Sequence, residues 1–158
     1  MEVGSFMRET KKSTQEILNE ILSGDNRKIW KASCEISSLS QNRAKILELL
    51  PYKQQIIGNT KDVDLGGGIY KVSIYLERAL NILEFHDQNL FCPCHLLGEF
   101  DNPTDLMQDG YFTLLSVGEY NYMGERDCTM RCNQCGTNYK VEPQEYHSIW
   151  WKWTPIEK

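Results

Sequence analysis

Apolar and polar positions follow two different periods along the chain, and the change between them falls near residue 90. From Ser13 to Ile57 apolar residues recur three and four positions apart, which is the spacing of one face of an α-helix. Beyond Tyr111 aromatic and β-branched residues dominate, as is typical of strands. The pattern predicts an α+β fold, in which a helical region (residues 1–90) packs on a small antiparallel β-rich lobe (residues 91–158).

Capping residues divide the helical region into short helices. Ser13, Asp25 and Asn42 each precede an apolar stripe and carry a side-chain oxygen that can accept a hydrogen bond from the first helical turn. Pro51 falls inside the third apolar run, where it is expected to kink or break the helix.

A loop and a long helix are expected next. Gly66-Gly67-Gly68 lacks the Lys-Ser/Thr pair that follows a phosphate-binding loop, so a linker or helix start is the better interpretation. The helix is expected from Ile69 to about Phe85, on the stripe formed by Val72, Tyr75, Leu80 and Leu83, among others.

The short helices resemble HEAT-like helical hairpins over residues 13–57. The resemblance depends on the turn at Gly24-Asp25 and on Trp30, Ala32 and Cys34 after it. The chain shows no repeat of fixed period, so a plain small bundle fits the same residues equally well.

Four strands are expected in the second half of the chain. Gly118 is expected to end or bulge the first strand, and Pro143-Gln144 is expected to form the turn before the last. The strands are expected over residues 111–117, 126–131, 137–142 and 146–153.

Four cysteines stand in two pairs with the spacing of metal-ligating turns. Clustered thiols in a reducing compartment bind metal more often than they form disulfides. A turn that carries two thiolates can hold one side of a tetrahedral ion, so two such turns predict a structural zinc site. The expected ligands are Cys92, Cys94, Cys132 and Cys135.

The second pair resembles the second knuckle of a zinc ribbon. The residues that carry the resemblance are Cys132-Asn133-Gln134-Cys135-Gly136, with Tyr139 and Val141 in the strand beyond. The first pair departs from the ribbon pattern, because only Pro93 separates its two thiols. Cys128 or His95 could therefore replace one of the four expected ligands.

Charge is distributed unevenly between the two halves. Residues 1–90 hold 12 basic and 12 acidic residues, whereas residues 91–158 hold 5 basic and 10 acidic ones and carry the whole net charge of −5. The acidic residues concentrate in residues 96–127, which we expect to form an acidic insertion. The candidate partner-binding residues are Glu99, Asp101, Asp105, Asp109, Glu119, Tyr120 and Tyr122.

This charge distribution favours a basic protein as partner and disfavours nucleic acid, whose binders neutralise phosphates. The histidines (His86, His95, His147) form no recognisable catalytic motif, so we do not expect an enzyme. No apolar stretch reaches the roughly 18 residues of a membrane span, and Met1–Lys12 lacks the apolar core of a secretory signal, so the chain is expected to be cytoplasmic.

The function expected from these features is non-catalytic protein binding by a zinc-stabilised module. Small acidic proteins that neutralise basic toxins, such as the immunity proteins of nuclease toxins, are similar in size and charge. Two alternatives stay open at this point. The first is a nucleic-acid-binding zinc ribbon of transcription or translation, and the second is a regulator whose thiols respond to zinc or oxidant.

Overall fold

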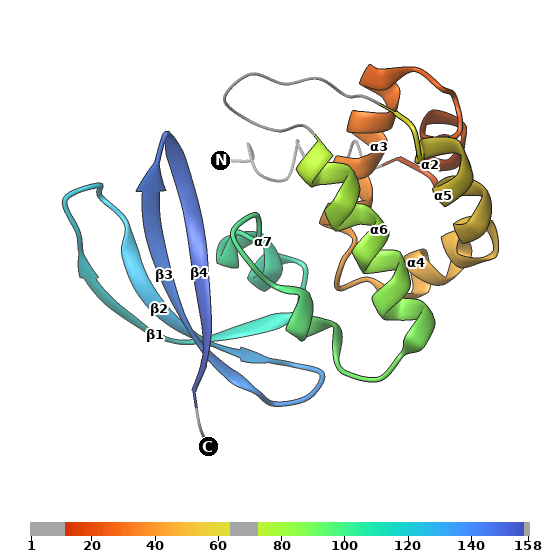
Figure 1. The fold of residues 1–158 in the computed structure, drawn as a ribbon. Coiled ribbons are helices and arrows are strands. Elements are labelled where there is room, and N and C mark those ends of the chain that lie inside the picture. Colours follow the sequence, from red (N-terminus) through yellow and green to blue (C-terminus); the bar gives the residue numbers. More distant parts are fainter. Residues whose placement is uncertain (1–11, 64–72, 157–158) are drawn as a thin grey trace. The chain divides into compact units, whose positions relative to one another are not determined.

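The structure, a computed structural model, describes residues 12–63 and 73–156 and has the predicted α+β composition (Figure 1). The chain divides into two compact units, Met1–Leu90 and Phe91–Lys158. Helices form the first unit and an antiparallel sheet dominates the second. No helix within the described ranges combines the length and the apolar character needed to cross a membrane.

The first unit consists of short helices whose starts follow the predicted caps. Ser13 accepts a hydrogen bond from the backbone N–H of Glu16 (3.2 Å), and Asp25 and Asn42 cap their helices in the same way. Pro51 breaks the third apolar run as expected. The described elements are α2 (Thr14–Ile21), α3 (Asn26–Ser38), α4 (Arg43–Leu49), the 3₁₀ turn η1 (Leu50–Tyr52), α5 (Lys53–Thr60) and α6 (Ser73–Gln88).

The core of this unit lies where α3 packs against α6 and α2. Its fully buried residues include Ile21, Ile29, Ile36 and Leu83. Helix α6 continues to Gln88, three residues beyond the expected end. The Gly66-Gly67-Gly68 loop and the expected helix start at Ile69 lie outside the described residues.

One buried histidine joins α6 to the segment before α4. His86 is 1% exposed; its Nε2 lies 2.8 Å from the carbonyl oxygen of Ser40, and its Nδ1 lies 3.3 Å from Nη1 of Arg43. The carbonyl can only accept and the guanidinium can only donate, so the ring is neutral with its proton on Nε2. Burial lowers the pKa of His86; the hydrogen bond to Ser40 opposes this shift, and the charge of Arg43 adds to it.

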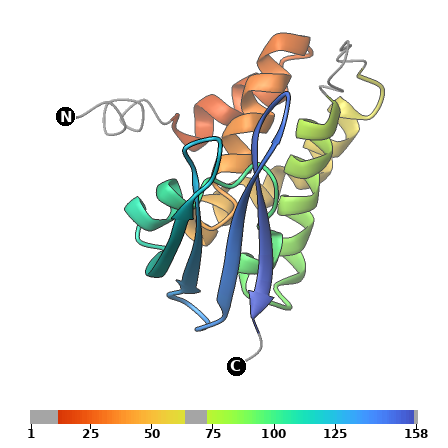
Figure 2. The ribbon, with the colours of Figure 1, turned by 90° about the vertical axis from the view of Figure 1, so that its left-hand side faces the viewer.

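The second unit is a four-stranded antiparallel sheet in the order β1-β2-β3-β4 (Figure 2). It is preceded by the 3₁₀ turn η2 (Pro93–Leu96) and by α7 (Pro103–Gln108). The strands are β1 (Phe112–Tyr120), β2 (Arg126–Cys132), β3 (Asn138–Tyr146) and β4 (Ser148–Ile156). Residues 96–127, expected as an insertion, therefore contain a helix and an edge strand of the sheet.

Pro143 does not form a turn, contrary to the prediction. It lies inside β3 opposite Trp151, and the chain reverses four residues later, at His147, whose φ is 63°. The β2–β3 pairing ends at Cys128 opposite Val141, so Pro143 lies beyond the last pair on that side. A proline is accommodated there because its missing N–H interrupts no ladder on the β2 side. Gly118 lies at a register shift of β1, which matches the expected bulge.

The sheet has one buried face, and aromatic rings dominate its core. The Trp153 ring packs edge-on against Phe112 and Tyr139, with centroid distances of 5.3 and 5.8 Å. Its indole N–H donates to the carbonyl oxygen of Asp101 (3.0 Å). Around these rings lie Cys94, Leu106, Met130, Cys132 and Val141, all buried. The two pairs of cysteines thus lie at the edge of the principal core of this unit.

The first unit should lose stability in mild acid because of His86. The pKa of His86 in the folded state lies below the value of about 6.5 in the unfolded chain. The contribution of neutral His86 to the free energy of unfolding is therefore complete above pH 6.5. It is lost as the pH falls through the pKa of His86 in the folded state. Urea unfolding followed by helical circular dichroism should show this loss in the wild type, and His86→Gln should reduce it.

The control is His147→Asn, which replaces an exposed histidine at a left-handed position that asparagine tolerates. This variant should keep the pH dependence of the wild type. A His86→Gln variant with an unchanged pH dependence would contradict the assignment.

Candidate metal centre

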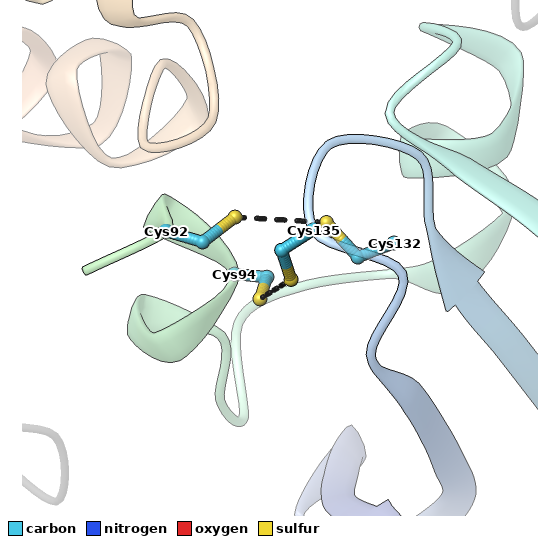
Figure 3. A group of neighbouring side chains, drawn as sticks. All are labelled: Cys92, Cys94, Cys132 and Cys135. Atoms are coloured by element: carbon cyan, nitrogen blue, oxygen red, sulfur yellow. Dashed lines mark hydrogen bonds between the residues drawn. The ribbon is translucent and has the colours of Figure 1, made fainter. Parts of the chain in front are cut away.

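Two turns present the four cysteines to one another (Figure 3). Cys92 precedes η2 and Cys94 lies within it, where the N–H of His95 donates to the carbonyl of Cys92 (3.0 Å). Cys132 ends β2 and Cys135 lies on the turn that follows. Each pair is brought together by local backbone structure, so the site needs only the two turns to meet.

Glycine closes the second turn. The N–H of Gly136 donates to the carbonyl of Cys132 (2.9 Å), and Gly136 has a φ of 80°, a left-handed conformation that side chains with a Cβ rarely adopt. The N–H of Cys132 in turn donates to the carbonyl of Thr137 (2.8 Å). These bonds hold the turn in the shape that directs both thiols toward the first pair.

The start of β1 braces the same turn. The Asn133 side chain donates to the carbonyl of Gly110 (2.9 Å) and accepts a hydrogen bond from the hydroxyl of Thr113 (2.6 Å). The N–H of Asn133 also donates to the carbonyl of Tyr111 (2.9 Å). The second knuckle is therefore fixed to the edge strand as well as to its own two strands.

The sulfur positions fit a tetrahedral ion. The four Sγ atoms lie within 4.8 Å of one another; Cys92 and Cys132 are 3.7 Å apart, and Cys94 and Cys135 are 3.5 Å apart. With Zn–S bonds of about 2.3 Å, a regular tetrahedron places its sulfurs about 3.8 Å apart. The four cysteines therefore lie close enough to hold a metal ion, and all of them are free thiols.

Protonation differs sharply within the cluster. Burial raises the pKa of Cys92 to about 11, and it also raises the pKa of Cys94 above its ordinary value. Burial acts in the same direction on Cys135, but hydrogen bonds from Thr137 and from the neighbouring thiols lower its pKa to about 6. Burial therefore favours the neutral form of these two thiols, and a cation bound among the sulfurs would favour their thiolates.

Hydroxyl groups lie beside two of the sulfurs. The Tyr139 hydroxyl lies 3.1 Å from Sγ of Cys94, and the Thr137 hydroxyl lies 3.2 Å from Sγ of Cys135. Arg131 instead bonds to Asn138, and Lys140 pairs with Glu142. Hydroxyl donors can stabilise thiolates without adding a repulsive charge beside a bound cation.

Cys128 and His95 lie outside the cluster. Cys128 is on β2 four residues before Cys132, a distance of about 13 Å along a strand. His95 is exposed, and its ring packs on Phe91 with a centroid distance of 5.5 Å. Neither residue belongs to the group of neighbouring sulfurs.

The candidate partner-binding residues have different environments. Tyr120 and Tyr122 are 68% and 88% exposed at the end of the β1–β2 hairpin. The side chains of Glu99, Asp105, Asp109 and Glu119 are exposed as well. Asp101, in contrast, is buried and accepts a hydrogen bond from the N–H of Gly98 (2.8 Å), so it stabilises its loop and does not lie on an exposed face.

Sequence reasoning missed the two hydroxyl donors at the cluster. Thr137 follows the second knuckle directly, and Tyr139 was noted only as part of the ribbon pattern. A signal was present, since strand alternation places Tyr139 and Val141 on the same face of β3, toward the core.

No protein-family model, curated protein or solved structure matches this chain. The zinc-ribbon resemblance of residues 132–141 is therefore not supported by a family.

The purified protein should contain one metal ion per chain, which we expect to be zinc. The Cys132→Ser/Cys135→Ser variant should contain none, because two oxygens replace two of the sulfurs. Elemental analysis measures the metal, and near-ultraviolet circular dichroism follows the packing of the Trp153 cluster. A metal-free wild-type protein that keeps its fold would contradict the site.

Tyr139→Phe should weaken zinc binding about tenfold, because it removes a hydrogen-bond donor to a ligand sulfur and leaves the ring packing intact. Competition with a chromophoric chelator measures the affinity. Tyr146→Phe, an exposed tyrosine of the same strand, is the control and should bind as the wild type does. Equal affinity of Tyr139→Phe and the control would show that the hydroxyl does not act on the site.

Proposed function

We propose that this chain is a non-catalytic protein-interaction module, stabilised by zinc, whose acidic surface binds a basic protein. The observation that carries the proposal is the exposed tip of the β1–β2 hairpin, where two tyrosines stand among carboxylates. Tyr120 and Tyr122 expose most of their side-chain surface beside Glu119 and Glu125. Exposed tyrosines of this kind supply contact area at low entropic cost, and the carboxylates favour a cationic partner.

A structural role of the metal supports the non-catalytic part of the proposal. Four thiolates fill the coordination of a tetrahedral zinc ion, so no position remains for water or substrate. Cys94 and Cys132 are also buried in the core of the unit. An ion at this place links turns and core, and it is poorly accessible to a substrate.

Part of the hairpin tip is ordered before any partner arrives. The N–H groups of Met123 and Glu125 both donate to Oδ1 of Asn121, at 2.9 and 3.0 Å. The hydroxyl of Tyr122 donates to the carboxylate of Glu145 on β3 (3.4 Å). An ordered tip loses less conformational entropy on binding, which supports an interface there.

A nuclease toxin is the partner class that we favour. The active surface of a nuclease is cationic because it binds phosphates, and residues 91–158 carry ten acidic and five basic residues. Carboxylates on this unit can occupy the positions of substrate phosphates. The same charges disfavour the alternative of a nucleic-acid-binding ribbon.

One observation favours the second candidate, a regulator that responds to zinc or oxidant. Cys135 is exposed, whereas its neighbours in the cluster are buried or half-buried. An exposed ligand is open to oxidants and to competing chelators. Slow zinc exchange and oxidation of Cys135 only after unfolding would support the structural role, and rapid release of zinc by mild oxidant would support the regulator.

The charge-reversed variant Asp105→Lys/Asp109→Lys should bind its partner about tenfold more weakly or worse, because two attractive charges become repulsive. Affinity capture with the wild-type and variant proteins, compared by quantitative mass spectrometry, identifies basic proteins lost from the variant. Their affinity should fall steeply with salt. The control is Glu48→Lys, an exposed charge reversal on α4 of the first unit.

A basic partner that binds wild-type protein and Asp105→Lys/Asp109→Lys equally would place its interface away from α7. Capture of no basic protein, with acidic proteins retained instead, would contradict the proposal.

A further inference from the structure

An open groove lies on the second unit between α7 and the β1–β2 hairpin. Met107 of α7 forms one wall, and Leu114 and Val117 of β1 form the other. Met130 and Trp151 of the sheet contribute to the lining between them. All five side chains are apolar. Met107, Leu114 and Val117 are each exposed by about two-fifths of their surface. A single large apolar side chain has the right size and chemistry to lie in such a groove.

The segment that supplies most of the groove's lining is predominantly acidic. Residues 99–127, which supply most of its lining, hold seven acidic residues and one basic residue. Glu125 lines the groove itself. Arg126 lines it as well, and two exposed carboxylates, Asp105 and Glu119, follow or precede lining residues directly in the chain. These carboxylates favour a cationic ligand at the groove's border.

The one basic residue of this segment is already engaged. The guanidinium carbon of Arg126 lies 4.6 Å from the centroid of the Tyr120 ring, and its Nε donates to the carbonyl of Gly118 (2.8 Å). This contact holds Arg126 against the hairpin at one end of the groove. The ring and the carbonyl fix the position of the guanidinium, so its charge stays at the hairpin.

Strand addition is disfavoured as the mode of binding. β1 is an edge strand, but its pairing with β2 shifts register twice within nine residues, between Leu114 and Ser116 and between Val117 and Tyr120. Irregular edges of this kind protect a sheet against pairing with another strand. Recognition at this place therefore depends on side chains and not on a backbone ladder.

We infer that this groove is the anchor site for the basic partner: one large apolar side chain of the partner lies between Met107 and Val117, and adjacent Lys or Arg side chains pair with Glu125 and Glu119. The inference rests on the proposed function and adds to it the chemistry of the recognised segment. That segment carries an apolar residue flanked by basic ones. The apolar contact supplies affinity, and the charges supply rate and orientation.

The test uses the full zinc-loaded chain and a phage-displayed library of random peptides. Selection at low salt should enrich peptides with a large apolar residue flanked by Lys or Arg. A synthetic copy of the enriched peptide is then titrated by fluorescence anisotropy. Replacing its apolar residue by serine should weaken binding about tenfold, as the loss of one buried side chain predicts.

Matched variants of β1 locate the contact. Val117→Thr keeps the shape and β-propensity of the residue and places a hydroxyl in the groove, so it should weaken binding about tenfold. Leu115→Thr is the control, because Leu115 is 40% exposed on the same strand, close to the 46% of Val117, and does not line the groove. Glu125→Gln should weaken binding at low salt and have little effect at high salt.

The possible outcomes distinguish binding in the groove from binding by the acidic surface alone. Basic peptides that tolerate both the serine replacement and Val117→Thr would overturn the groove and leave the acidic surface in place. Enrichment of acidic peptides, or of no basic ones, would overturn the groove and the proposed function together.

Discussion

The contact among four sulfur atoms is the constraint on which the second unit depends. Cys94 and Cys132 are at once members of the cluster and buried residues of the core, in contact with the aromatic group around Phe112. The core alone is small, and small domains bury too little apolar surface to be robust without a covalent or metal cross-link. Zinc would supply this cross-link, and the energy of binding would then be part of the energy of folding.

The two units differ in what stabilises them. The first unit has an aliphatic core and capped helices. The second unit uses its apolar residues on one face of a sheet and leaves the edge strand and the hairpin tip open. This arrangement keeps polar and aromatic groups available at the surface while the cysteines and the buried rings provide stability.

Local rules predicted much of the structure because they act over a few residues. Ser13, Asp25 and Asn42 cap helices by bonding to an N–H three positions ahead, and Pro51 breaks a helix by its own geometry. Each pair of cysteines was predicted to share a turn because its two residues are close in sequence. In these cases residues within the same short segment determine its structure.

The errors arise where distant partners decide. Pro143 is typical of a turn, yet it lies in a strand because β3 pairs with β4 at this position and the pairing with β2 ends before it. Asp101 belongs to an acidic segment, yet it is buried, and its carbonyl accepts a hydrogen bond from Trp153, 52 residues away. The roles of Tyr139 and Thr137 depend on which sulfur lies within reach, and this is set by the meeting of two distant turns.

The separation of the two cysteine pairs has a consequence for synthesis of the chain. Thirty-seven residues lie between Cys94 and Cys132, and they include α7 and β1. During synthesis Cys92 and Cys94 emerge well before Cys132 and Cys135, so the first two cysteines are at first without the other two. Closing a loop of this length costs several kcal/mol of chain entropy, about 3–4 kcal/mol by the relation for cross-linked chains. The two cysteine pairs are therefore expected to meet late in synthesis, after the residues of α7 and β1 have emerged.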